Sequence, residues 1–329
     1  MTNYFLIIII CIISLPVSFI ISKKLKLYDY PSSKRKIHKK PILIGGGIFL
    51  IICIMSYFLL CLFQNNINPS IKYNFKIFIF PIILFFLGIY DDKFNLNSNI
   101  KLILSSLLYL ILILIDESLL INNLKFSFIN KTLILGNFSI FFTVFCFVVF
   151  LNALNMFDGI DGQSAIYSII IILLINSIGN ISNIIFLILV CLIIYLFFNI
   201  KKKLFLGESG VIVISYFISI TFIEYYNSNI IKNVDLIFLF FAIPGYELIR
   251  LTFHRILNRK HPFSADDNHL HHYFAKIFNQ RTALFLIILN YMLPIILYFV
   301  GIKLLLCILT SLFLYIISLI VCYEKLRSK

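Results

Sequence analysis

Apolar runs about as long as a membrane helix alternate with short polar segments along the whole chain. A helix needs about 20 apolar residues to cross the hydrocarbon core, whereas the strands of a membrane barrel are shorter and alternate in polarity. The runs therefore predict an all-α, polytopic membrane protein of about eleven transmembrane helices, with residues 1–329 as one integral-membrane domain. The predicted spans are 4–22, 42–63, 75–90, 100–116, 139–156, 163–178, 183–200, 210–226, 236–250, 284–300 and 304–323.

Composition agrees with this pattern. Hydrophobic residues make up 61% of the chain and charged residues only 13%, against about 25% charged residues in a typical soluble domain. The seven cysteines all lie in apolar runs without a CxxC pair, so we expect buried small hydrophobic side chains and neither a zinc site nor a disulfide framework. Because the first run is long and its positive charges follow it, it predicts a retained span and not a cleaved signal peptide.

Positive charge predicts the orientation. Lysine and arginine are enriched in cytoplasmic loops of membrane proteins, and 22 of the 28 such residues fall on one side of the predicted spans. This places the N-terminus outside and the C-terminus inside. All six histidines and ten of the 14 acids lie on the same side, which predicts an active site on the cytoplasmic face. The predicted cytoplasmic loops are 23–41, 91–99, 157–162, 201–209 and 251–283.

The central motif reads LNALNMFDGIDG over residues 151–162. Asp158 and Asp161 each precede a glycine at the end of a predicted span, where a carboxylate usually has a partner or a function. With Asn152 and Asn155 one turn upstream, they form an all-oxygen cluster of the kind that suits Mg²⁺ and disfavours soft metals. The alternative is a polar helix end that closes a hairpin.

Two further inner helix ends carry acids. Asp91 and Asp92 are adjacent, and Lys101 follows where the next span begins. Neighbouring carboxylates repel each other unless a cation or a shared proton relieves them, so a metal–phosphate site is one reading and a solvated helix end is the other. Glu208 lies between two glycines at a third inner end.

Basic and histidine-rich loops complete the inner face. Lys36 and His38 belong to a basic cluster in the first loop, which either binds phosphate or serves as the orientation signal and contacts anionic lipid. The last loop holds His269, His271 and His272. We interpret them as hydrogen-bond donors to a phosphate or leaving group, because a zinc site would lie among carboxylates without cysteine; a solvated loop is the alternative.

These residue types suit phosphoryl transfer. That reaction needs Mg²⁺ on charged oxygens, cations that neutralise the transition state and an acceptor held in line. No Ser-His-Asp or Cys-His order points to nucleophilic hydrolysis. The membrane setting suggests a lipid phosphate as the acceptor.

The ordered motifs D-x-P, RK-x-H, G-x-x-DD, NAxNxxDGxDG, LG-acid-x-G and PFS-x-D-x-x-HxHH resemble those of the polyprenyl-phosphate N-acetylhexosamine-1-phosphate transferases of glycosyltransferase family 4. The undecaprenyl-phosphate GlcNAc-1-phosphate transferases are the most similar branch, and the resemblance covers roughly residues 25–275. It implies transfer of HexNAc-1-phosphate, with GlcNAc favoured, from a UDP-sugar to undecaprenyl phosphate, with release of UMP. It further implies Mg²⁺, or alternatively Mn²⁺, as cofactor and the bacterial cytoplasmic (inner) membrane as location. The product would be the first lipid-linked sugar of a cell-surface polysaccharide such as lipopolysaccharide O-antigen or a cell-wall polymer. Membrane lipids are expected partners and nucleic acid is not.

The resemblance also implies roles for residues. The implied catalytic residues are Asp91, Asp92 and Asp158, of which one of the paired acids orients and deprotonates the lipid phosphate; the implied metal ligands are Asp161 and Glu208; the implied substrate-binding residues are Lys36, His38, Lys101, Asn155, His269, His271 and His272.

Several positions depart from the family pattern. Glu208 and Glu247 replace aspartates, Val211 replaces a serine and Ala265 replaces a proline, while one extra residue separates Pro31 from His38. The acid changes keep the charge, so we interpret them as tuning; an inactive paralogue stays open. A phospho-MurNAc-pentapeptide transferase-like enzyme is an alternative within the resemblance. From another class, a secondary transporter would place its ionisable groups near the bilayer midplane, and a membrane scaffold leaves the one-sided acids unexplained.

Overall fold

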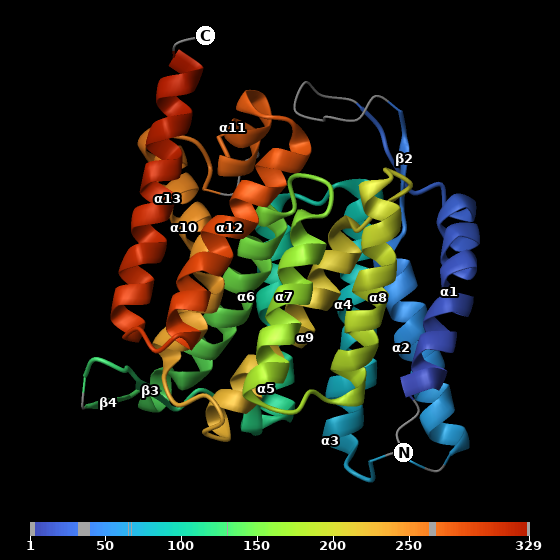
Figure 1. Cartoon of the computed structure of the whole chain (residues 1–329). Helices are drawn as coiled ribbons and strands as arrows, with labels where there is room; N and C mark the ends of the chain where they lie inside the picture. The colour runs from blue at the N-terminus through green and yellow to red at the C-terminus, as the bar shows by residue number, and fades with distance from the viewer. Residues whose placement is uncertain are drawn as a thin grey trace. The chain divides into compact units, whose positions relative to one another are not determined.

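The structure, a computed structural model, describes residues 4–31, 40–64, 66, 68–129, 131–262 and 268–327. Helices dominate this part of the chain (Figure 1). The helices are α1 (Tyr4–Lys24), α2 (Gly46–Phe63), α3 (Ile71–Asn74), α4 (Phe80–Phe94), α5 (Ser98–Ile115), α6 (Ser139–Phe157), α7 (Gln163–Ile178), α8 (Asn183–Ile200), α9 (Gly207–Asn227), α10 (Val234–Leu257), α11 (Leu270–Ile277), α12 (Gln280–Phe299) and α13 (Leu304–Arg327). The strands are β1 (Tyr28–Asp29), β2 (Ile42–Ile44), β3 (Asn123–Lys125), β4 (Thr132–Ile134) and β5 (Leu204–Phe205).

The predicted spans coincide with helices of the structure, except that the span predicted to begin at residue 42 starts with strand β2 and becomes helical at Gly46. Within the described residues, ten helices are long and apolar enough to cross a membrane. One of the ten is the continuous run Ile71–Phe94, in which α3, a π-helical segment (Phe75–Ile79) and α4 follow one another. The predicted span at 163–178 is helix α7, which is apolar but shorter than these ten. The all-helical, polytopic fold is therefore confirmed, while the count of eleven spans and their orientation stay predictions.

The chain packs as two compact units. Unit 1 comprises Met1–Leu119 and Ser168–Thr221, and unit 2 comprises Leu120–Tyr167 and Phe222–Lys329. Helices α7 and α9 each contribute residues to both units.

In unit 1, helices α1, α2 and α8 pack against one another, and α4 packs on both α2 and α5. The thiols of Cys11, Cys53 and Cys191 meet where α1, α2 and α8 join, and each of these side chains is completely buried. The Sγ atoms of Cys11 and Cys191 lie 3.5 Å apart. All seven cysteines are free thiols, as the sequence predicts.

A small sheet forms one end of unit 1. Strand β2 pairs antiparallel with β1 and parallel with β5, with Leu43 opposite Leu204. The backbone N–H of Gly45 donates to the carbonyl of Phe205 at 3.1 Å, and that of Gly47 donates to Leu206 at 3.0 Å. Because these contacts continue past the strands, the start of α2 is joined to the segment that leads into α9.

In unit 2, α10 packs against α6, α12 and α13, and α11 packs between the last two of these helices in Figure 1. Strands β3 and β4 pair antiparallel, with Leu124 opposite Leu133, and form a small hairpin. Asp235, in the first turn of α10, accepts the backbone N–H of Ser127 at 3.1 Å. The hydroxyl of Tyr226 donates to the carbonyl of Asn123 at 3.0 Å. These contacts fasten the hairpin segment to the helices of its own unit.

Candidate active site

A lysine between two acids forms the centre of the unit 1 cluster. Asp91 lies near the end of α4, Lys101 in the first turn of α5 and Glu208 in the first turn of α9. The Lys101 ammonium lies 3.0 Å from Asp91 Oδ2 and also forms an ion pair with Glu208. Asp91 Oδ1 accepts the backbone N–H of Leu96 at 2.7 Å, in the turn that joins α4 to α5. Three helix ends are thus held together by one cation.

Asp92 caps α9 from another helix. Its Oδ1 accepts the backbone N–H of Glu208 at 2.7 Å, and its Oδ2 accepts the N–H of Ser209 at 3.2 Å and the hydroxyl of Ser209 at 2.6 Å. The first N–H groups of a helix have no partner within that helix, and the helix dipole favours a negative charge beside them. Asp92 therefore fixes the first turn of α9, which carries Glu208.

Glycines allow this close approach. Gly207 has φ +76°, a left-handed conformation that glycine adopts without strain, and a Cβ there would lie 2.8 Å from Asp92 Oδ2. A Cβ added to Gly88, one turn before Asp92 on α4, would overlap the backbone of Ser209. The same holds for Gly47 at the start of α2, where an added Cβ would also overlap Ser209.

The central motif forms a turn in unit 2. Helix α6 ends at Phe157, and the backbone N–H of Asp158 still donates to the carbonyl of Asn155 at 3.2 Å. The Asp158 carboxylate is exposed and accepts the hydroxyl of Ser164. Asp161 is half-buried, and its Oδ2 accepts the side-chain amide of Gln280 at 2.7 Å. Both carboxylates are therefore oriented by neutral donors.

The second histidine of the last-loop motif packs on this turn. A Cβ added to Gly159 would overlap the imidazole of His271, so the backbone between the two acids touches that ring. The ring centroids of His271 and His272 lie 4.4 Å apart. Burial, with smaller contributions from the nearby charges of His269, His272 and Arg250, lowers the pKa of His271 well below its usual range. A neutral imidazole at pH 7 follows, which acts as a donor through one ring nitrogen only.

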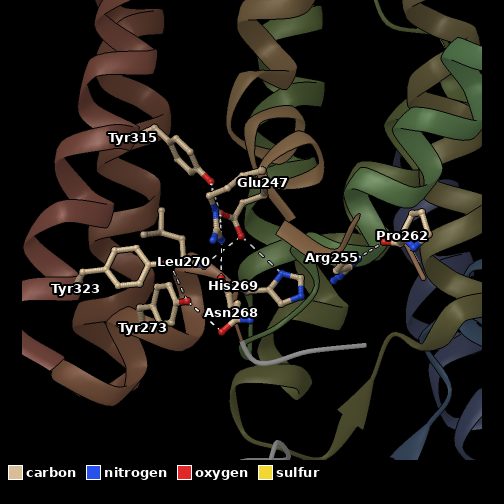
Figure 2. A network of polar contacts seen from close by, with 10 residues as sticks. Glu247, Arg255, Pro262, Asn268, His269, Leu270, Tyr273, Tyr315 and Tyr323 are labelled. Carbon is tan, nitrogen blue, oxygen red and sulfur yellow. Dashed lines mark hydrogen bonds and ion pairs between the residues drawn. The ribbon is translucent and has the colours of Figure 1, made fainter. Parts of the chain in front are cut away.

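A buried acid on α10 holds the start of α11. Figure 2 shows Glu247 between Tyr315 and the segment Asn268–Leu270. Its Oε2 accepts the backbone N–H of Leu270 at 3.1 Å and lies 3.6 Å from Nδ1 of His269, the N-cap of α11. The Arg250 guanidinium is 2.8 Å from Glu247 Oε1 and also donates to the carbonyl of Asn268. The position of the histidine motif thus depends on a carboxylate–guanidinium pair.

The structure therefore gathers the predicted residues into two groups. Asp91, Asp92, Lys101 and Glu208 meet in unit 1, whereas Asp158, Asp161, His269, His271 and His272 belong to unit 2, as does the half-buried Asn155. Lys36 and His38 lie outside the described residues, as does Ala265.

Sequence reasoning missed the neighbours that orient these groups. They are Ser209 for Asp92, Ser164 for Asp158, Gln280 for Asp161, and Arg250 with Tyr315 for Glu247. Ser164 stands close enough in sequence to be found from the motif alone. The partners on distant helices leave no local signal.

The predicted metal ligands have the right donor chemistry for Mg²⁺. Asp161 and Glu208 offer only carboxylate oxygens, and Mg²⁺ is typically bound by one or two carboxylates together with phosphates and water. Among the described residues, the group of three metal-ligating side chains that meets at close range is the cysteine group of unit 1. Its soft sulfur atoms do not suit Mg²⁺. Glu208 and Asp161 belong to different units.

The chain is thus of a class of polytopic helical membrane proteins. It carries acids and a lysine at the ends of apolar helices, and histidines at the start of α11. The family model of glycosyl transferase family 4 matches residues 74–226. This stretch contains the paired acids, Lys101, the central motif and Glu208. The resemblance predicted from the motifs is thereby confirmed: over these residues, which make up slightly less than half of the chain, the protein is similar to glycosyl transferase family 4.

Two curated proteins are similar over most of the chain. The undecaprenyl-phosphate alpha-N-acetylglucosaminyl 1-phosphate transferase of Thermotoga maritima is 28% identical over 273 residues, which cover 82% of this chain and 80% of the relative. The probable undecaprenyl-phosphate N-acetylglucosaminyl 1-phosphate transferase of Bacillus subtilis is 25% identical over 261 residues, or 77% of this chain and 70% of the relative.

Proposed function

We propose that this protein transfers N-acetylhexosamine-1-phosphate from a UDP-sugar to undecaprenyl phosphate. An oxygen of the lipid phosphate forms a bond to the sugar-bearing phosphorus of the UDP-sugar, and the bond from that phosphorus to the bridging oxygen breaks. UMP leaves with that oxygen. We take GlcNAc as the sugar because the names of both relatives specify it. The product is the first lipid-linked sugar of a cell-surface polysaccharide, made at the inner face of the bacterial cytoplasmic membrane.

The observation that carries this proposal is the Asp91–Lys101–Glu208 cluster at the ends of three apolar helices. When a phosphate binds at these helix ends, the Lys101 ammonium can pair with a phosphate oxygen in place of one of its two carboxylates. The positive charge of the lysine then remains neutralised. A secondary transporter would place such groups near the bilayer midplane in interrupted helices. The position of the cluster therefore favours an enzyme that acts on a lipid headgroup.

Each residue then has a part in the proposed reaction. Asp91 orients and deprotonates the lipid phosphate, Lys101 neutralises a phosphate oxygen, and Asp92 holds the first turn of α9. Asp158 acts beside the diphosphate as a second catalytic carboxylate. His269, His271 and His272 contact the nucleotide, and the lowered pKa of His271 makes it a neutral hydrogen-bond donor. Lys36, His38 and Asn155 are the remaining proposed substrate contacts.

Asp161 in unit 2 and Glu208 in unit 1 are the proposed metal ligands, each within its own unit, and the metal would be Mg²⁺ or alternatively Mn²⁺. When bound, such an ion neutralises charge on the diphosphate oxygens as a Lewis acid. Glutamate at position 208 is one methylene longer than aspartate, but its carboxylate lies at the start of α9, where the cap from Asp92 fixes the backbone.

The test uses membranes that contain the protein, incubated with radiolabelled UDP-GlcNAc, undecaprenyl phosphate and Mg²⁺. We expect label in the organic phase together with released UMP, and no such product from the Asp161→Asn protein. Product from UDP-MurNAc-pentapeptide alone would favour the peptidoglycan-type reaction. Solute uptake by sealed vesicles without any lipid product would favour a transporter and refute the proposal.

A further inference from the structure

The last helix of the chain reaches the histidine motif through one hydroxyl group. The hydroxyl of Tyr315 on α13 donates to Glu247 Oε1 and accepts Nε of Arg250 at 2.8 Å (Figure 2). Only 3% of the Glu247 side chain is exposed, so this contact lies in a nearly dry environment. A hydrogen bond to a charged group is stronger than one between neutral groups. Tyr315 thus contacts both charges that hold the segment before α11.

Three consecutive residues of that segment depend on this pair of charges. Arg250 holds the carbonyl of Asn268, and Glu247 faces both the ring of His269 and the backbone N–H of Leu270. Tyr315 follows Leu270 by more than forty positions in the sequence, so the link between α13 and this segment comes from the folded structure. A movement of the carboxylate or guanidinium would therefore shift the start of α11 as a unit.

Helix α13 has a second contact with the same region. The hydroxyls of Tyr323 and Tyr273 lie 3.3 Å apart, and the Tyr273 hydroxyl donates to Asn268 Oδ1 at 3.2 Å. Tyr315 and Tyr323 are about two helical turns apart on α13. Two tyrosines of one helix thus reach the residues that flank the histidine motif.

We infer that Tyr315 is a positioning residue for the histidine motif, so that α13 helps to place the histidines that are proposed to contact the nucleotide. Helix α13 lies beyond the residues that match the family model. Tyr315 touches neither substrate nor metal in this inference. It fixes Glu247 and Arg250, which in turn fix Asn268, His269 and Leu270. The inference deepens the proposed function and rests on it wherever activity is measured.

The kinetic test compares Tyr315→Phe with a matched control. Phenylalanine keeps the ring and removes only the hydroxyl. Tyr246→Phe is the control, because the Tyr246 hydroxyl also joins α10 to α13, at 3.4 Å from the carbonyl of Ile308, and the variant keeps the ring that lies 5.5 Å from that of Tyr315. We expect Tyr315→Phe to raise KM for the UDP-sugar about tenfold and to change KM for undecaprenyl phosphate less than twofold. Tyr246→Phe should change neither.

A general loss of folded protein would lower the apparent kcat and leave both KM values unchanged. That result, or an equal rise of both KM values, would overturn the inference. A rise in KM for the UDP-sugar in both variants would also overturn it. The loss of any hydrogen bond between α10 and α13 would then produce the effect, and the contact of Tyr315 with Glu247 and Arg250 would not be special.

A second measurement does not need activity. Hydrogen–deuterium exchange of the purified protein in detergent reports on the Leu270 amide and its neighbours in α11. We expect faster exchange over residues 268–277 in Tyr315→Phe and wild-type exchange there in Tyr246→Phe. Unchanged exchange in Tyr315→Phe would refute the positioning role. If wild-type protein makes no lipid product from any UDP-sugar, the proposed function fails, while the exchange result still decides whether α13 positions the motif.

Discussion

Asp92 provides the sharpest test of how the unit 1 cluster is built. Substitution by alanine removes three hydrogen bonds to the start of α9: two backbone N–H groups and the Ser209 hydroxyl. Loss of an N-cap costs about 0.5–2 kcal/mol, and a donor left buried without a partner costs about 1–3 kcal/mol. We therefore expect Asp92→Ala to lower the free energy of unfolding by about 2 kcal/mol.

Thermal unfolding of the purified protein in detergent measures this loss. For a chain of roughly this size, 1 kcal/mol corresponds to about 2–4 °C in Tm, so Asp92→Ala should lower Tm by about 4–8 °C. Asp92→Asn should lose less, because its remaining oxygen can still accept the Glu208 N–H while its amide group faces the Ser209 N–H. The exposed acid Glu117 offers a control in the same unit, and Glu117→Ala should leave Tm unchanged.

The result that would refute this reasoning is a wild-type Tm for Asp92→Ala with loss of activity. Asp92 would then act only in the chemistry, and the start of α9 would be held by other contacts. A fall in Tm for both alanine variants would show a general sensitivity to charge and would equally contradict the role of Asp92 as a cap.

Three further predictions test the rest of the site. Gly159→Ala should abolish most activity, since its Cβ would overlap the His271 ring, whereas Gly245→Ala should retain wild-type activity in the same assay because no atom lies within 4 Å of its added Cβ. Lys101→Met leaves Asp91 and Glu208 facing each other without their cation, so we expect at least a hundredfold loss of lipid product, on the scale of a few kcal/mol for a broken buried pair; activity within tenfold of wild type would contradict this. Because the pKa of His271 is lowered in the folded protein, the folded state binds fewer protons than the unfolded state. Stability should therefore be full above about pH 6.5, the ordinary pKa of histidine, and should fall as the pH drops below it; Tm scans from pH 7.5 to 5 should show a smaller fall for His271→Gln.

The membrane spans could be predicted from the sequence because hydrophobic runs of helical length are a local signal. The sheet could not, because β1 and β5 have two residues each and show no alternation of polar and apolar positions. Helix α11 was also missed. The sequence prediction treated residues 251–283 as one loop, whereas tertiary contacts form α11 there and bury Leu270, His271, Tyr273 and Phe274.

In the candidate site, too, some features could be predicted from the sequence and others could not. Motif spacing predicted the acids and histidines as candidates, because the acids stand at the ends of apolar runs and the histidines cluster in the long polar loop 251–283. It could not predict that Lys101 would bridge Asp91 and Glu208, because more than one hundred residues separate the lysine from its second partner. Likewise, nothing near Glu247 in sequence indicated that Tyr315 on α13 would reach it.

The parallel pairing of β2 with β5 has a consequence for the order of assembly during synthesis. Leu43 pairs with Leu204, so the partner of β2 leaves the ribosome only after about 160 further residues. At the usual elongation rates of 5–20 residues per second, this delay is on the order of ten seconds. Helices α1 and α2 are therefore inserted well before the edge of β2 is covered. A nascent chain that ends before β5 should leave the segment around Gly45 open to protease, and one that extends past α9 should protect it.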